Sequence, residues 1–223
     1  MIHTSLLCCL FLFTLPVSVK ASDPPTGAKV FDFEDPKGTN AISLSIDAPF
    51  EPVVGYASGI TGKATFDPKA PEKTTGKIVV DISSVRFSNE GYTGTVRFFA
   101  LQEKKYPTIT CELKRIVSGR VVKEGVYEGK VEADLTCKGI TKTQIFDLYV
   151  RYYPGTARLR VPDIDGDLLN VRCNFKIRRS DYNIAKGVEA ELIGDDVEDQ
   201  VALVGIAGKK RQETPAPAKS ANP

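Results

Sequence analysis

The sequence predicts an all-β, antiparallel fold, and three observations support it. Apolar and polar residues alternate with period two in several segments between Ile42 and Ile206, as in strands with one buried and one exposed face. Glycine and proline separate these segments, as turns in an antiparallel protein require. One hairpin can also be registered from its side chains alone.

The clearest alternation lies in residues 170–178, where Val171, Cys173, Phe175 and Ile177 alternate with polar or charged side chains. The same pattern recurs in residues 42–46, 78–82 and 146–152. We expect these strands to share an apolar inner face while Glu, Lys and Asp point outward throughout. The predicted inner face consists of Ile109, Leu113, Val131, Ala133, Leu135, Phe146, Leu148, Val150, Val171, Phe175 and Ile177.

The registered hairpin turns at residues 123–125, so that paired residue numbers have a constant sum. This register places Arg120 opposite Glu128 and Lys114 opposite Asp134 on one face. Val117 then faces Val131 on the other face, and a bulge is expected at Arg115 and Ile116, where the faces invert. The same register opposes Cys111 and Cys137, which makes them a disulfide candidate. The alternative is two free thiols packed as small apolar residues.

Two segments depart from the alternation. Residues 97–105 precede Tyr106-Pro107 and are interpreted as a short helix or cap. It should end before Pro107, because a proline disfavours helix in the residue before it. Residues 208–223 are basic and then rich in Pro and Ala, without a large apolar side chain. This composition predicts a disordered tail.

The N-terminus predicts export. An apolar run from Leu6 to Val19 precedes Val19-Lys20-Ala21, so residues 1–21 are interpreted as a signal peptide cleaved before Ser22. The alternative, an uncleaved anchor, usually needs about 18 apolar residues or more. We therefore expect a soluble periplasmic or secreted protein with an N-terminal extension over residues 22–41 and a barrel domain over residues 42–207.

The composition of the mature chain excludes several kinds of catalytic and metal site. The single histidine, His3, lies in the signal, so a Ser-His-Asp triad, a Cys-His pair and a His-ligated metal are excluded. The full chain has a formal charge of +2, and loss of Lys20 with the signal leaves 29 basic against 28 acidic residues, a charge of +1 that argues against a nucleic-acid binder. Asp163, Asp165 and Asp167 have the spacing of a calcium loop but lack its closing Glu, so we interpret them as a polar turn. We expect no metal, no cofactor and no catalytic residue.

Four stretches in order resemble the YceI-like family of secreted, lipocalin-like barrels that bind polyisoprenoid lipids. They are Gly59–Val85, Lys104–Leu113 (KKYPTITCEL), Tyr127–Val150 and Phe175–Ile184 (FKIRRSDYNI), and GDDVEDQVAL from Gly194 to Leu203 closes the match. The most specific run is LTCKGITK, from Leu135 to Lys142. One departure concerns the cap, where the family pairs its arginine with an acidic residue and Arg97 is followed by Phe98 instead.

The resemblance implies an eight-stranded antiparallel barrel with a short helical cap, and a non-catalytic role. The protein would bind an isoprenoid-type lipid, polyprenyl or quinone, and transport or sequester it, with at most transient membrane contact. The implied lipid-binding residues are Phe98, Phe99, Tyr106, Ile109, Leu113, Val131, Leu135, Phe146, Leu148, Val150, Phe175 and Ile177.

Two other classes of function remain open. The first is a structural or interaction module of the envelope, in which the barrel interior is filled by its own side chains, since any packed barrel needs an apolar inner face. An enzyme would have to use Cys, Asp, Glu, Lys or Tyr alone as nucleophile or base.

Overall fold

The computed structural model describes residues 27–189 and 191–210. The predicted signal peptide, residues 1–21, and residues 211–223 of the predicted tail lie outside this part of the chain. Within it, no helix is long and apolar enough to cross a membrane.

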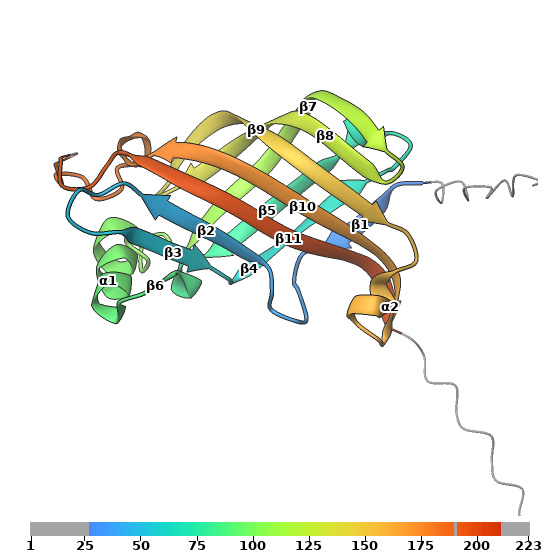
Figure 1. The fold of residues 1–223 in the computed structure, drawn as a ribbon, viewed down its shortest axis with the longest axis horizontal. Coiled ribbons are helices and arrows are strands. Elements are labelled where there is room, and N and C mark those ends of the chain that lie inside the picture. The colour runs from blue at the N-terminus through green and yellow to red at the C-terminus, as the bar shows by residue number, and fades with distance from the viewer. Residues whose placement is uncertain (1–26, 190, 211–223) are drawn as a thin grey trace, which may run out of the picture.

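Eight antiparallel strands close into a barrel in the described part of the chain, as the sequence predicts (Figure 1). Each strand pairs with the next around the ring, and β1 closes it by pairing with both β4 and β11. In ring order the strands are β1 (Lys29–Asp32), β4 (Ile60–Phe66), β5 (Thr75–Asp81), β7 (Thr108–Lys123), β8 (Val126–Cys137), β9 (Ile140–Tyr153), β10 (Ile164–Arg178) and β11 (Asp196–Lys210).

Three further strands branch from β11. The ring uses the second half of β11, where Ile206 pairs with Asp32 of β1. The first half of β11 pairs instead with β2 (Ala41–Ile46), which continues to β3 (Val53–Ala57) and β6 (Arg86–Phe87). The sheet is therefore wider at one end than at the other.

Short helices cover this wider end. The helix α1 (Glu90–Thr95) begins at Asn89, whose side chain accepts a hydrogen bond from Tyr92 N–H, and continues as the π-helical turn η3 (Val96–Ala100). A cap is thus present, but it starts before the predicted residues 97–105. The other helical segments are η1 (Pro71–Lys73), η2 (Ile82–Ser84), η4 (Arg179–Tyr182) and α2 (Ala157–Arg160), which lies at the opposite end from α1 (Figure 1).

The alternation of the sequence becomes the two faces of the barrel wall. In β8, Val131, Ala133 and Leu135 are buried, whereas Lys130 is exposed and its ammonium lies 2.7 Å from Asp147 of β9. Pairs of this kind connect neighbouring strands on the outer face. Exposed pairs contribute at most about 1 kcal/mol each, so burial of the inner face dominates the stability.

The β7–β8 hairpin keeps part of its predicted register. Arg120 lies opposite Glu128 with their side chains 2.7 Å apart, as predicted. Lys114 forms an ion pair with Asp134, but the residue opposite Asp134 is Glu112, so the predicted pairing of Lys114 with Asp134 is wrong. The turn itself is tighter, because Lys123 already pairs with Val126.

Two bulges overturn the predicted disulfide. The register shifts by one residue between Leu113 and Arg115 and again between Ile116 and Ser118, so Val131 faces Ile116 instead of Val117. The combined shift of two keeps inward residues inward but places Cys111 opposite Leu135. The prediction of a Cys111–Cys137 bond is therefore wrong, and the three cysteines of the described chain are free thiols.

The boundaries of the barrel also differ from the prediction. Residues 22–41 are not merely an extension, because β1 belongs to the ring and its Phe31 is fully buried. At the other end β11 continues through Gly208, Lys209 and Lys210, which the sequence assigns to the tail. Their pairing with Ile164, Asp165 and Gly166 of β10 orders them in spite of their composition.

An aromatic cluster closes the interior near β1. The rings of Phe31, Phe66, Tyr127 and Tyr152 contact one another with centroids 5.2–6.4 Å apart, in edge-on or tilted arrangements. The Tyr152 hydroxyl donates a 2.6 Å hydrogen bond to the buried Asp167. This cluster forms a solid floor beneath the rest of the barrel.

Asp167 is structural. Burial disfavours its charge, but hydrogen bonds from Lys29, Tyr152 and Gly155 outweigh that effect and hold the pKa of the carboxyl below its usual value. Among the described residues, no group of three or more His, Cys, Asp or Glu side chains is arranged to hold a metal ion.

Candidate functional site: the barrel cavity

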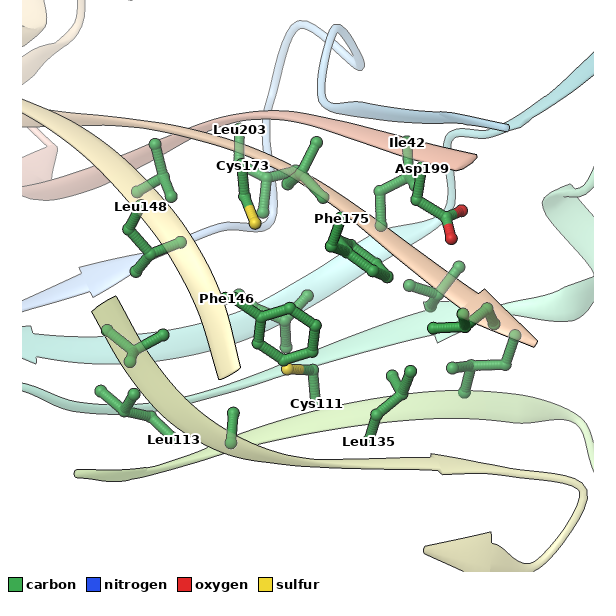
Figure 2. A pocket seen from close by; sticks show the side chains of 18 of the residues that line it. Ile42, Cys111, Leu113, Leu135, Phe146, Leu148, Cys173, Phe175, Asp199 and Leu203 are labelled. Atoms are coloured by element: carbon green, nitrogen blue, oxygen red, sulfur yellow. The ribbon is translucent and has the colours of Figure 1, made fainter. Parts of the chain in front are cut away.

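The barrel is hollow above the aromatic floor. Its cavity has a volume of about 490 Å³ and an almost wholly apolar wall (Figure 2). This volume lies in the range of about 300–1,000 Å³ that is usual for small-molecule sites. Nine of the predicted lipid-binding residues line it: Ile109, Leu113, Val131, Leu135, Phe146, Leu148, Val150, Phe175 and Ile177.

The accessibility of the wall supports a real hollow. Leu113, Leu148, Val150 and Phe175 point inward and line the cavity, yet each is only half-buried. In a filled barrel such residues would lose nearly all their accessible surface to neighbouring side chains. Here part of that surface faces empty space, so the inner face is larger than its own side chains can fill.

Phe146 and Phe175 form an aromatic pair in the wall. Their rings lie edge to face with centroids 4.8 Å apart and belong to strands β9 and β10. Figure 2 shows both rings projecting between the strands toward Cys111 and Leu135 on the opposite side. A chain-like ligand in the cavity would contact both rings.

The cavity reaches the surface between β5 and β7. The last β5–β7 pair joins Lys77 to Glu112, and β7 continues beyond it without a further pair to β5. The cavity wall there includes exposed residues, among them Glu72 of η1 and Ser118 and Arg120 of β7. The opening therefore lies beyond the last β5–β7 pair, along the part of β7 that carries the bulges.

Phe98 and Phe99 are not part of the cavity. Successive residues of a helical turn point in different directions, and in η3 it is Val96 and Ala100 that line the cavity. Phe98 and Phe99 are consequently 51% and 78% exposed. Their placement as cavity residues is wrong because the phase of the helix could not be read from a segment this short.

Tyr106 also lies outside the cavity wall. Its ring packs on the β8–β9 turn, where a Cβ added to Gly139 would lie 3.1 Å from it. Gly139 has a positive φ of 75°, so this turn needs glycine both for its backbone and for the contact. The ammonium of Lys105 lies 5.0 Å from the centroid of the same ring.

Arg97 has an acidic partner after all. Its guanidinium donates two hydrogen bonds to Glu103, at 2.7 and 3.0 Å, and the backbone N–H of Glu103 donates to its carbonyl. The pair ties η3 to the segment that leads into Tyr106-Pro107. Glu103 follows Arg97 by six residues, and it is the acidic partner that the sequence analysis did not find for this arginine.

Several cavity residues were missed by the sequence reasoning. Most come from the cap, from β6 and from β11, where the sequence analysis recognised no alternation. Two lie in β2, whose alternation was recognised but which was not assigned to the site. The main ones are Ile42, Leu44, Phe87, Tyr92, Val96, Ala100, Leu101 and Leu203.

Two inward carboxylates, Asp167 beside the aromatic floor and Asp199 in the cavity wall, contradict the expectation that all carboxylates point outward. Asp199 of β11 lines the cavity, is only 9% exposed and lies beside Phe175 of β10 and Leu44 of β2. Its Oδ2 has no hydrogen-bond partner. Burial raises the pKa of the Asp199 carboxyl to about 7. Period two does predict this position, since Asp199 shares a face with Val197 and Val201.

Of the other buried groups of the wall, Arg179 is hydrogen-bonded and the thiols are neutral. Buried Arg179 donates hydrogen bonds to the carbonyls of Ile184, Ile193 and Gly194 at 2.7–3.2 Å, which fixes the loop after η4. Burial raises the pKa of Cys111 to about 11 and that of Cys137 to about 12, so these thiols are protonated at neutral pH. The arrangement suits the binding of an apolar molecule.

Several solved structures have a fold similar to this barrel. It matches Burkholderia cenocepacia BcnA with a TM-score of 0.61 and 19% identity, over 74% of this chain and 95% of that one. The Campylobacter jejuni YCEI protein matches with a TM-score of 0.57 and 17% identity, over 91% of this chain and 100% of that one.

A third similar structure is described as a polyisoprenoid binding domain from Saccharophagus degradans implicated in plant cell wall breakdown. Its TM-score is 0.57 at 14% identity, and the match covers 82% of this chain and 99% of that domain. At these identities the three structures show a shared fold. A comparison with curated protein sequences finds no match.

The sequence itself matches the YceI-like domain over residues 34–204, which is most of the chain and nearly all of the barrel. The resemblance carried by runs such as LTCKGITK is thereby confirmed. The chain belongs to the YceI-like family.

Proposed function

We propose that the protein binds an isoprenoid-type lipid, polyprenyl or quinone, inside the barrel and carries or sequesters it in the periplasm. The observation that carries this proposal is the apolar cavity of about 490 Å³ between the aromatic floor and the cap. The similarity to a polyisoprenoid binding domain supports it. The family supports a binding role over a catalytic one.

The energetics depend on how dry the cavity is. Burying a methylene group away from water is worth about 0.8 kcal/mol, but a lipid tail already has this gain in a membrane. Transfer into the barrel is close to neutral only where the wall is as apolar as the bilayer. A wall of aliphatic and aromatic side chains meets this condition, and a protonated Asp199 preserves it below about pH 7.

The alternative is a structural module with a self-filled barrel. It requires the inner side chains to fill the interior, whereas inward residues such as Leu148 and Val150 retain accessible surface. The volume of the cavity therefore favours a ligand.

Export to the periplasm and a transient membrane contact complete the proposal. A lipid carrier must meet the bilayer that supplies its cargo, and the cap offers a surface for this. Phe98 and Phe99 are exposed on η3, while Val96 and Ala100 of the same turn line the cavity. Lys104 and Lys105 lie beside Phe98 and would favour an anionic surface.

The direct test is to isolate the protein from the envelope of its native host and identify any lipid by organic extraction and mass spectrometry. We expect one isoprenoid lipid in stoichiometric amounts. Phe146→Asp or Phe175→Asp should abolish its co-purification, because either change replaces one of the two central rings by a carboxylate in the apolar wall.

The matched control is Ile145→Asp. Ile145 precedes Phe146 on β9 and is 51% exposed, so this change adds the same charge to the same strand on its outer face. It should leave the lipid bound. Recovery of a folded native protein without any lipid would contradict the proposal.

A further inference from the structure

We propose that Asp199 recognises an uncharged oxygen-bearing head group, a hydroxyl or a carbonyl, of a lipid whose polar end lies inside the barrel. This inference rests on the proposed function and refines it. It states which end of the ligand lies within the barrel and which head-group chemistry is accepted there.

Asp199 occupies an inward position in an otherwise apolar part of the wall. It lies on β11 between Phe175 of β10 and Leu44 of β2, and it shares its inward face with Val197 and Val201. Figure 2 shows its carboxyl group among apolar side chains near Ile42 and Phe175. Apolar packing alone would be served better by an aliphatic residue at this point of the wall.

Asp199 also lacks a hydrogen-bond partner within the described part of the chain. Buried polar atoms in folded proteins are nearly always hydrogen-bonded, yet Oδ2 of Asp199 has no partner. Because the side chain is part of the cavity wall, a ligand in the cavity can supply the missing bond. The other buried carboxylate at the barrel interior, Asp167, differs in having Lys29, Tyr152 and Gly155 as partners.

The charges around Asp199 select the head group. The titratable groups near it are the protonated thiols of Cys137 on β8 and Cys173 on β10. No described Lys or Arg forms an ion pair with Asp199, and Arg179 is engaged with backbone carbonyls. A phosphate here would find no cation and would be repelled once Asp199 ionises. A neutral alcohol or quinone meets neither difficulty.

The two neutral head groups differ in their use of Asp199. The protonated carboxyl donates its O–H to a quinone carbonyl or to an alcohol oxygen. Once ionised, Asp199 only accepts, so it still binds an alcohol O–H but has nothing to offer a carbonyl. The dependence of binding on pH therefore distinguishes a quinone carbonyl from an alcohol hydroxyl.

The experiment compares farnesol with farnesane, its hydrocarbon counterpart, and with farnesyl phosphate and a ubiquinone bearing two isoprene units. Each is titrated against a fluorescent apolar dye bound in the barrel, at about pH 6 and pH 8.5. We expect the wild type at pH 6 to bind farnesol and the quinone about tenfold more tightly than farnesane, the contribution of one hydrogen bond. Only the quinone should lose this preference at pH 8.5.

Three variants test the role of the side chain. Asp199→Leu should bind all the neutral probes as weakly as farnesane. Asp199→Asn should keep the preference for the quinone at both pH values, because an amide donates without titrating. Glu198→Gln is the control, since it removes an exposed carboxylate paired with Lys176 one residue away on the outer face. It should behave as the wild type.

The outcomes separate the two proposals. An equal preference for farnesol in the wild type and Asp199→Leu would overturn the role of Asp199 while leaving lipid binding intact. Tighter binding of farnesyl phosphate than of farnesol would overturn the uncharged head group. Failure of every probe, farnesane included, to displace the dye would overturn the proposed function together with this inference.

Discussion

Asp199 makes the stability of the barrel depend on pH. In the unfolded chain its carboxyl ionises near pH 3.8, whereas burial raises its pKa in the folded state to about 7. Between these values the unfolded chain releases a proton that the folded chain keeps. The contribution of Asp199 to stability is therefore full below about pH 4, declines as the pH rises to about 7 and is lost above it.

Asp199→Asn should remove this decline. We expect the variant to be more stable than the wild type at pH 8 by a few kcal/mol, at about 1.4 kcal/mol per pKa unit, and to differ much less at pH 4. Urea unfolding at the two pH values measures the difference. The exposed control Glu198→Gln should show no such trend, and an Asp199→Asn variant with an unchanged pH profile would refute the raised pKa.

At the scale of elements, the β7–β8 hairpin depends on two bulges that the sequence only partly indicates. Its side-chain faces are predictable, but each bulge shifts the partner of every residue beyond it. Cys111 consequently faces Leu135, and directly opposed antiparallel residues have Cα separations within the disulfide range.

Leu135→Cys should therefore form a disulfide with Cys111 on mild oxidation. Peptide mapping under non-reducing conditions would show the linked peptides. The wild type, treated in the same way, should retain free thiols at Cys111 and Cys137. A Cys111–Cys137 link in the wild type would instead restore the register without bulges.

The cap is the second element with a consequence that can be tested. Burying a Phe side chain is worth about 1.5–3 kcal/mol, so replacing Phe98 and Phe99 together by Ser should weaken binding to anionic phospholipid vesicles by more than tenfold. Sedimentation with vesicles measures this. Leu159→Ser is the control, because Leu159 is 87% exposed on α2 at the opposite end of the barrel. An equal effect of both changes would exclude the cap as the contact.

For the whole molecule, closure of the ring depends on the short strand β1. It joins β4 to β11, and its Phe31 contacts Phe66 and Tyr152 in the aromatic floor. Closure leaves the ring without free edges there and seals the cavity below.

Phe31→Ala should lower the free energy of unfolding by about 3–5 kcal/mol, the usual loss for a fully buried Phe. Val30→Ala is the matched control on the same strand, since Val30 is 56% exposed, and it should change the stability by less than about 1 kcal/mol. Urea denaturation measures both. Equal small effects would mean that β1 does not close the barrel.

The sequence by itself determined the faces of the strands. Alternation assigned residues such as Val131, Leu135 and Phe146 to the inside correctly, because a strand turns successive side chains to opposite sides whatever its neighbours are. The family and its barrel were likewise readable from runs such as LTCKGITK. These properties are local, so local sequence is sufficient for them.

Only the tertiary structure decided what depends on several segments at once. The opening beside the bulges, the entry of β1 into the ring and the outward turn of Phe98 are set by contacts between distant parts of the chain. The hollow interior depends on the diameter of a closed ring compared with the volume of the side chains inside it. The missing hydrogen bond of Asp199 also depends on the tertiary structure, because several strands together bury its carboxyl without placing a donor beside Oδ2.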